Sequence, residues 1–263
     1  MKPAKRFSYL ETDSPANLPS GPEPNQPTTA EEYFSRGDEL YYSGNFEEAL
    51  RIYARALGID PAFERAWLGQ VKSLVEMGEY PQAEVWANKG IERFPQSAAL
   101  LSAKAVVLAR QGMVERAIGF SDSSLQVSGD SPFVWISRGQ VFLAARNPSG
   151  ADHCFTKAFE GRDRDWQLHM EAGRIYLAAG EPDRAQLHFE LVTQINPKNA
   201  FAWWNLGLCL ERTVHTDRAK ECFQKAVKLD PYQDLFHNTL KRFKQENGLF
   251  GWLLTHIRKW SGR

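Results

Sequence analysis

Cysteine, net charge and long hydrophobic runs are all scarce in this 263-residue sequence. Three cysteines are too few and too widely spaced for a disulfide framework or a zinc ribbon, which favours a reducing compartment. Lys and Arg together number 32, as do Asp and Glu, so the balance argues against a globally basic nucleic-acid binder. No stretch approaches the roughly 18 apolar residues of a membrane-spanning helix, and the basic start lacks the apolar segment of a secretory signal. We therefore expect a cytoplasmic protein that binds no nucleic acid.

Recognisable catalytic and cofactor-binding motifs are also missing. The sequence has no HExxH helix, no nucleophile elbow, no phosphate-binding Gly loop and no CxxC pair. His153 and Cys154 are adjacent, so on a helix they would point about 100° apart. His169, His188 and His215 fall in different predicted helices without a shared ligand spacing. We predict that the chain is not an enzyme and that it holds no cofactor and no metal ion.

The first 29 residues contain little apolar surface. Six of the fourteen prolines lie there, separated by Asn, Ser, Thr and Gly. Such a composition offers too little burial to offset the entropy of ordering, so residues 1–29 are predicted to be a disordered Pro-rich tail. A simple tether is the favoured role, and a Pro-rich ligand for a partner domain is the alternative.

Beyond this tail, the dominant feature is a period of 34 residues. Alanine recurs six times at this spacing, at Ala49, Ala83, Ala117, Ala151, Ala185 and Ala219. Other residues keep the same period or a multiple of it: Gly139, Gly173 and Gly207; Tyr53, Phe155, Phe189 and Phe223; Pro61, Pro95, Pro197 and Pro231. A fixed period of this length indicates an array of structural repeats.

Each period reads as two helices joined by a turn, and residues 200–233 give the clearest case. The first helix has an apolar stripe with helical spacing, formed by Trp203, Leu206, Gly207 and Leu210. Gly207 removes a side chain where a neighbouring helix must approach closely. Ala219, Phe223, Ala226 and Val227 mark the second helix, and Pro231 follows it, where a helix cannot continue.

This phased pattern resembles the tetratricopeptide repeat, a 34-residue helix-turn-helix unit. Six repeats fit, at 30–63, 64–97, 98–131, 132–165, 166–199 and 200–233. The resemblance implies an all-α fold, a right-handed α-solenoid of antiparallel helix pairs. Four positions depart from the pattern and make regular packing least expected around them: Ser121 replaces an aromatic, Gly129 and Asp163 replace the terminal Pro, and Val214 replaces a turn glycine.

In proteins of this family the first helices line a concave groove, so the resemblance implies a non-catalytic scaffold or adaptor that binds a protein or peptide segment there. At the corresponding positions, the later repeats offer apolar side chains with a few cations. Aromatic and Arg side chains are common anchors in such interfaces. The predicted groove residues are Arg110, Phe133, Ile136, Gln140, Met170, Arg174, Phe201, Trp204 and Arg212. Alternatively, these residues fill the interior of a tightly curled superhelix or lie under the last helix of the chain.

After the last repeat, residues 234–247 are predicted to form a capping helix, because its apolar residues can pack inward while its polar residues face outward. The inward residues are Leu235, Phe236, Leu240 and Phe243, and the outward residues are Lys241, Arg242, Lys244 and Gln245. Residues 248–263 form an amphipathic tail rich in aromatic and basic residues. This tail folds back on the solenoid, binds a partner, or lies on an anionic membrane as part of a membrane-peripheral assembly factor. Its candidate contact residues are Phe250, Trp252, Leu253, Ile257, Arg258, Lys259 and Trp260.

The zero net charge conceals an asymmetry along the chain. The first repeat, residues 30–63, has a net charge of −4, whereas residues 234–263 have a net charge of +4. The two ends of the array therefore differ in sign. This asymmetry either is unselected scatter or supports docking on an anionic surface or head-to-tail self-association.

Overall fold

A computed structural model describes residues 27–128 and 130–260 of the chain, and it describes only the backbone of residues 248–260. The predicted tail at residues 1–29 therefore lies almost wholly outside the described residues. Within them the secondary structure is helical and contains no strand, which confirms the all-α class. The helices are α1 (Ala30–Tyr42), α2 (Phe46–Ile59), α3 (Glu64–Glu76), α4 (Tyr80–Arg93), α5 (Ala98–Arg110), α6 (Val114–Ser128), α7 (Pro132–Ala144), α8 (Pro148–Phe159), α9 (Trp166–Ala178), α10 (Pro182–Ile195), α11 (Ala200–Arg212), α12 (Thr216–Leu229) and α13 (Asp234–Trp260).

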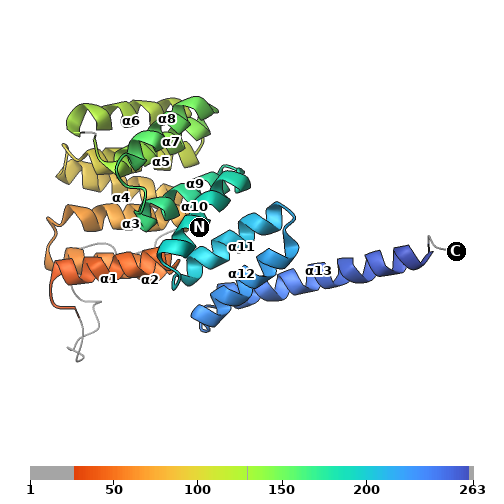
Figure 1. The fold of residues 1–263 in the computed structure, drawn as a ribbon. Helices are drawn as coiled ribbons and strands as arrows, with labels where there is room; N and C mark the ends of the chain where they lie inside the picture. Colours follow the sequence, from red (N-terminus) through yellow and green to blue (C-terminus); the bar gives the residue numbers. More distant parts are fainter. Residues whose placement is uncertain (1–26, 129, 261–263) are drawn as a thin grey trace, which may run out of the picture. The chain divides into compact units, whose positions relative to one another are not determined.

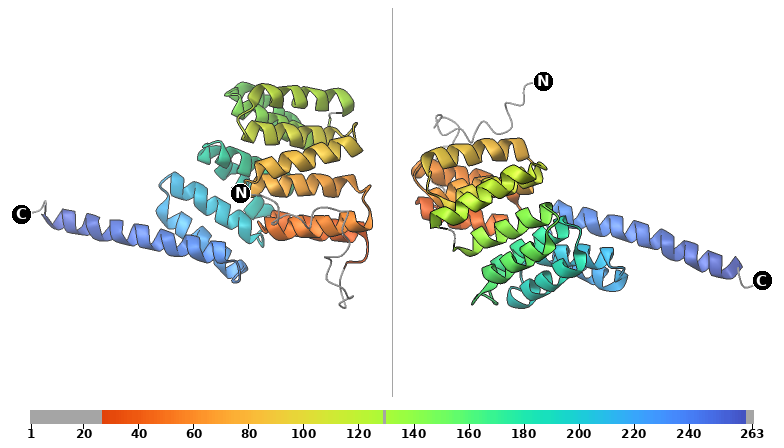
Figure 2. Two further views of the ribbon diagram at one scale, coloured as in Figure 1. Left: turned by 180° about the vertical axis from the view of Figure 1, so that it is seen from behind. Right: turned by 90° about the horizontal axis from the view of Figure 1, so that it is seen from above.

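The helices belong to two compact units, an N-terminal unit of residues 1–163 with α1 to α8 and a C-terminal unit of residues 164–263 with α9 to α13. In each unit, consecutive helices pack against one another in pairs, and each pair packs on the next (Figures 1 and 2). The recurring alanines Ala49, Ala83, Ala117, Ala151, Ala185 and Ala219 are all fully buried. Small side chains at these points allow the helices of neighbouring pairs to approach closely.

The first helix of most repeats begins at a polar N-cap, and these caps keep the 34-residue period. Side-chain oxygens at the cap accept hydrogen bonds from backbone N–H groups of the first turn, at Thr29, Ser97, Ser131, Asp165 and Asn199. Thr29 and Glu32 form a full capping box. Phe63 is the exception, because its side chain cannot accept a hydrogen bond. The caps fix where each first helix starts and hence the register of its inward face.

The turn between the two helices of a repeat has one residue with a positive φ angle. Glycine fills this position at Gly44, Gly78, Gly112 and Gly180. Arg146 and Val214 take the equivalent positions with φ of 56° and 64°. The turn at Val214, expected from the sequence to be irregular, therefore keeps the same left-handed conformation at a steric cost for a β-branched side chain.

Close approach of an aromatic ring explains the period of the helix glycines. A Cβ atom placed on Gly207 would lie 2.6 Å from the ring of Phe223, which is too close for any real contact. The same conflict arises for the pairs Gly37 and Tyr53, Gly139 and Phe155, and Gly173 and Phe189. The predicted close approach at Gly207 is confirmed, and each such ring joins the two helices of its own repeat.

Candidate peptide-binding surface

In the N-terminal unit, side chains from three first helices meet around Lys72 of α3. Its Nζ lies 4.5 Å from the ring centroid of Tyr41 and 5.5 Å from those of Tyr42 and Phe133. Tyr41 and Tyr42 come from α1, and Phe133 comes from α7. Tyr42, Lys72 and Phe133 remain partly exposed. The contacts are within the range of cation–π interactions and gather aromatic and cationic groups on one face.

The intervening helix α5 has small side chains at its inward repeat positions, Ala99, Ser102, Val106 and Ala109. Because α5 packs against both α3 and α7, these small residues leave room for Lys72 and Phe133 to meet across it. Side chains of α1, α3, α5 and α7 therefore share one face of the N-terminal unit. We call this surface, made by Tyr42, Lys72, Arg110, Phe133 and Gln140, the α5 face.

Arg110 and Gln140 bring α5 and α7 together at the other end of this face. With the amide oxygen of Gln140 turned toward α5, it accepts hydrogen bonds from Arg110 Nε and Nη2 at 2.8 and 3.1 Å. Both side chains are partly exposed. Ile136, the fourth predicted groove residue in this unit, is only 2% exposed and packs in the interior. Three of the four predicted residues in this unit therefore lie at the surface.

A second aromatic and cationic group lies at the start of the array. The guanidinium of Arg65 lies 4.7 Å from the ring centroid of Phe34 and 4.9 Å from that of Phe63, and it forms an ion pair with Glu31. Phe34 and Phe63 also contact each other edge to face, with centroids 5.4 Å apart. The cation and rings of this group are thus mutually satisfied and link the first repeat to the second.

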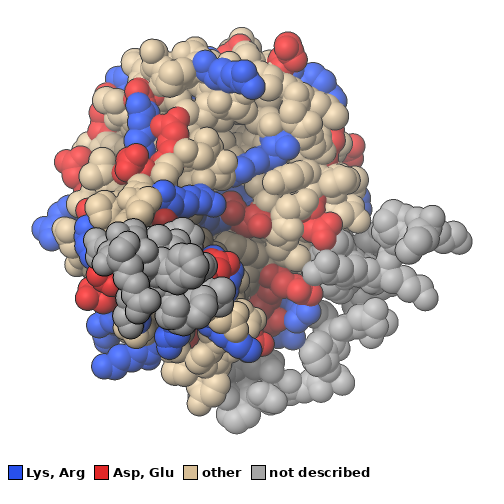
Figure 3. Space-filling model, turned by 90° about the vertical axis from the view of Figure 1, so that its right-hand side faces the viewer, with Lys and Arg blue, Asp and Glu red and all other residues tan. Residues whose placement is uncertain are grey.

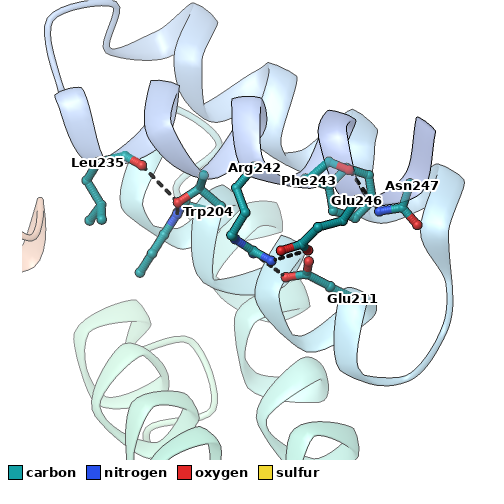
Figure 4. A network of polar contacts seen from close by, with 8 residues as sticks. Trp204, Glu211, Leu235, Arg242, Phe243, Glu246 and Asn247 are labelled. Carbon is teal, nitrogen blue, oxygen red and sulfur yellow. Dashed lines mark hydrogen bonds and ion pairs between the residues drawn. The ribbon is translucent and has the colours of Figure 1, made fainter. Parts of the chain in front are cut away.

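In the C-terminal unit, the predicted groove residue Trp204 packs against α13 (Figure 4). Its indole Nε1–H donates a hydrogen bond to Thr239 Oγ1 at 3.0 Å, and Thr239 in turn donates to the backbone oxygen of Leu235 at 2.8 Å. The indole stacks on Phe201 with centroids 5.4 Å apart and also contacts Phe236. Trp204 therefore anchors α13 and is only partly exposed.

An ion-pair network beside Trp204 holds the next turns of α13. Arg242 donates to Glu211 of α11 at 2.8 Å and to Glu246 of its own helix at 2.7 Å (Figure 4). Its hydrogen bond to Glu211 raises the pKa of the guanidinium further. Phe236 and Phe243 are almost fully buried, and Phe243 meets Phe223 of α12 edge to face. The described half of α13 thus packs on the last repeat with an apolar side, while Lys241 and Lys244 are exposed. The inward prediction was wrong for Leu235, which is 41% exposed, because Phe236 takes the inward position and adjacent helix residues point about 100° apart.

The other predicted groove residues of the C-terminal unit divide by burial. Met170, Arg174 and Phe201 are each less than 9% exposed, so a peptide cannot reach them without a rearrangement. Arg212 is exposed, and its Nη1 donates a hydrogen bond to the backbone oxygen of Leu177 at 3.2 Å. Arg212 is therefore the most accessible of the five predicted residues in this unit.

A histidine pair in the C-terminal unit was not foreseen from the sequence. His169 Nδ1 and His188 Nδ1 lie 2.9 Å apart, so one nitrogen donates to the other. Tyr176 stacks on His188 with centroids 5.6 Å apart, and Arg184 lies over the Tyr176 ring. Burial, together with the neighbouring His169, lowers the pKa of His188 to about 4. The 19-residue spacing crosses a turn, which is why a search for ligand motifs within one helix missed it.

Reactive groups elsewhere do not assemble into a site. Within the described residues, no group of three or more His, Cys, Asp or Glu side chains is placed to hold a metal ion. All three cysteines are buried, and burial raises the pKa of Cys209 to about 12 and that of Cys222 to about 11. Thiols of this kind are poor nucleophiles at neutral pH. On the face drawn in Figure 3, Lys and Arg side chains are interspersed with Asp and Glu rather than gathered in one patch.

The predicted contact residues of the tail, from Phe250 to Trp260, lie outside the residues whose side chains are described. The backbone shows that α13 continues through this stretch as one helix. Over the described part of the chain, none of the helices combines the length and the apolar character that crossing a bilayer requires.

Models of the tetratricopeptide repeat family match residues 40–107, 136–200 and 200–232, which together make up more than half of the chain. The chain belongs to the tetratricopeptide repeat family. The family resemblance seen in the 34-residue period is thereby confirmed, and the observed helix pairs are those of tetratricopeptide repeats.

Two other proteins are similar to this chain in sequence at low identity. The tetratricopeptide chain is 24% identical over 204 residues, 77% of its length, to the human protein O-mannosyl-transferase TMTC1. It is 25% identical over 122 residues, 46% of its length, to anaphase-promoting complex subunit 3 of Schizosaccharomyces pombe. The matched parts make up only 20% and 18% of these two relatives, so neither activity nor assembly is carried over from them.

A solved structure supports the fold in the same way. A tetratricopeptide repeat protein from Parabacteroides merdae superposes with a TM-score of 0.53 at 20% identity. The superposition covers 84% of this chain and 86% of that protein. The all-α architecture of helix pairs, as in tetratricopeptide solenoids, is therefore shared over most of both chains.

Proposed function

We propose that this tetratricopeptide repeat protein is a non-catalytic scaffold that binds an extended protein segment on the α5 face. The observation that carries the proposal is the cluster around Lys72 of α3. Its ammonium group lies near the rings of Tyr41 and Tyr42 of α1 and near the ring of Phe133 of α7. Rigid rings and cations presented by helices are the groups that most often dominate binding energy in protein interfaces.

The chemistry of the α5 face favours a segment with an apolar side chain and a carboxylate. Phe133 and Tyr42, which remain partly exposed, offer ring surface to the apolar side chain. Arg110, held in place by Gln140, offers a planar guanidinium that pairs with a carboxylate through two directed hydrogen bonds.

The test uses a phage-displayed library of random nine-residue peptides selected on the full chain. We expect the selected peptides to contain an apolar residue and an Asp or Glu, and their binding is measured by fluorescence anisotropy. Lys72→Ala and Arg110→Ala should each weaken binding about tenfold. Changing the peptide carboxylate to its amide should reduce binding to the wild type and leave binding to Arg110→Ala unchanged.

Lys89→Ala is a matched control. Lys89 of α4 lies 4.5 Å from the ring centroid of Trp86, the same distance as Lys72 from Tyr41, but on a second helix. Its replacement should leave peptide affinity unaltered, with circular dichroism showing that all variants keep their helix content. Equal losses in Lys72→Ala and Lys89→Ala, or selected peptides that bind Arg110→Ala at full strength, would refute the role of the α5 face.

A further inference from the structure

The last helix differs from the other first helices in length, although it starts in register with them. The first helices α1, α3, α5, α7, α9 and α11 each contain 13 residues, and α13 contains 27. Asp234 follows Ala200, the first residue of α11, by one period of 34 residues. Helix α13 therefore begins as the first helix of a seventh repeat and then continues where a turn is due.

The expected turn position is Gly248, one period after Val214. In the six repeats this position has a positive φ angle and ends the turn, whereas at Gly248 the backbone remains helical. The glycine needed for a turn is thus present, and the reason that no second helix follows must lie in the residues after it.

Two positions of a second helix are occupied by small or medium-sized buried side chains in the six repeats, and residues 248–260 have large side chains at both positions. The first is the position of the recurring alanines, which are fully buried in all six repeats; the seventh repeat has Leu253 there. The second position holds Ala56, Gly90, Ser124, Ala158, Val192 and Ala226, all buried; the seventh repeat has Trp260. Overpacking of this size prevents a close helix pair, so the alternative in which this segment folds back as a second helix is disfavoured.

The apolar sequence pattern of α13 nevertheless continues along the whole helix. Phe236 and Phe243, which are buried against the last repeat, are followed at the same seven-residue spacing by Phe250 and Ile257. Residues this far apart lie on one side of a helix. Leu254 falls at the same register as Phe236 and Phe243, so the sequence predicts an apolar side that extends beyond the residues that contact α11 and α12.

The charge of this segment indicates what covers that side. Residues 248–263 contain no Asp or Glu, and they contain Arg258, Lys259 and Arg263, with Trp252 and Trp260 among the apolar residues. Exposed Lys241 and Lys244 add cations to the preceding turns. Pairing with a second copy of this segment would bring like charges together, whereas an anionic lipid surface is complementary to them and suits the two tryptophans.

We propose that residues 248–260 of α13 form an interfacial helix that docks on anionic lipid and holds the repeat array at a membrane surface. The helix lies in the plane of the interface, with Phe250, Leu254 and Ile257 toward the acyl chains and the cations toward the headgroups. This role is independent of peptide binding on the α5 face.

The experiment is flotation of the full-length chain with vesicles of phosphatidylcholine containing about 30% phosphatidylglycerol, against vesicles of phosphatidylcholine alone. We expect the bound fraction to be about tenfold greater on the anionic vesicles and to fall as salt is raised. Leu254→Glu with Ile257→Glu should abolish flotation without changing the melting temperature, because the described contacts of α13 with the last repeat precede this segment.

Leu187→Glu with Leu191→Glu is the matched control, because these α10 side chains are 63% and 37% exposed and lie outside the segment. This control should float as the wild type does. Absence of flotation with anionic vesicles, or full flotation of the Leu254→Glu, Ile257→Glu variant, would overturn the proposal. So would light scattering that shows a dimer converted to a monomer by that variant, since a second copy would then cover the apolar side.

Discussion

Phe34 in the first repeat and Trp204 in the sixth occupy the same repeat position, but their surroundings differ. The ring of Phe34 is partly exposed and lies under the guanidinium of Arg65, a side chain of the next first helix. Trp204 meets the next first helix through a hydrogen bond to Thr239 and contacts with Phe236. An inward position of the repeat thus lies under a cation at one end of the array and anchors the capping helix at the other.

The contrast teaches that a repeat position does not by itself define a binding residue. What the next helix places over it decides whether the side chain is available. A cation over a ring leaves a polar surface on which a ligand can compete, whereas a hydrogen-bonded indole is committed to the fold.

The largest effect is expected at Trp204. Trp204→Ala removes the indole contacts and the hydrogen bond to Thr239, and it should lower the free energy of unfolding by about 3 kcal/mol. Phe34→Ala, at the equivalent position, should lower it by about half as much, because it removes ring contacts but no hydrogen bond. Urea denaturation followed by circular dichroism measures both. Equal decreases in the free energy of unfolding would show that Phe34 and Trp204 contribute equally to stability, contrary to this prediction.

The next effect concerns pH and belongs to the C-terminal unit. The folded state keeps His188 neutral down to about pH 4, whereas an unfolded histidine takes up a proton near pH 6.5. The unfolded state therefore binds more protons in this window, and stability should fall by about 2 kcal/mol as the pH drops from 6.5 to 4.

His188→Gln should flatten this dependence, as judged by urea midpoints measured at several pH values. His153→Gln provides the comparison, because His153 is exposed on α8 of the N-terminal unit. If both variants keep the wild-type slope, the loss at low pH arises elsewhere, for instance from carboxylates.

The smallest effect is expected at the turns that lack glycine. Val214→Gly relieves a β-branched side chain from a φ of 64° and should raise the free energy of unfolding by about 1 kcal/mol. Arg146→Gly, at the equivalent turn of the N-terminal unit, should gain less because an unbranched side chain tolerates this conformation better. Thermal unfolding of the two variants tests the order. A destabilised Val214→Gly would indicate that the entropy gained by the unfolded chain exceeds the strain relieved.

The fold followed from the sequence because its determinants are local and periodic. The alanines, the helix glycines and their aromatic partners act within one repeat or between neighbours, so their spacing alone indicated how they pack. Even Val214, the residue least expected to keep the turn, adopts the same φ sign as the turn glycines. Packing imposed by the rest of the repeat outweighs the preference of one residue.

The candidate site was predictable only in part, since exposure depends on contacts between separate repeats. Phe133 and Arg110 were predicted as groove residues, but the sequence assigned Lys72 and Tyr42, which lie on the same face, to a mixed, charged region. The period gives the direction in which a side chain points from its own helix. It contains no information on which neighbour covers that side chain, and so the burial of Ile136 and Met170 was left open.

The burial of the three native thiols has a practical consequence. A maleimide reacts with an accessible thiolate, and Cys154, Cys209 and Cys222 are all buried, with pKa values raised by that burial. A cysteine introduced at Tyr232, whose side chain is 95% exposed, should therefore be labelled selectively in the folded protein. A fluorophore or spin label can thus be attached beside α13 without first removing any native cysteine.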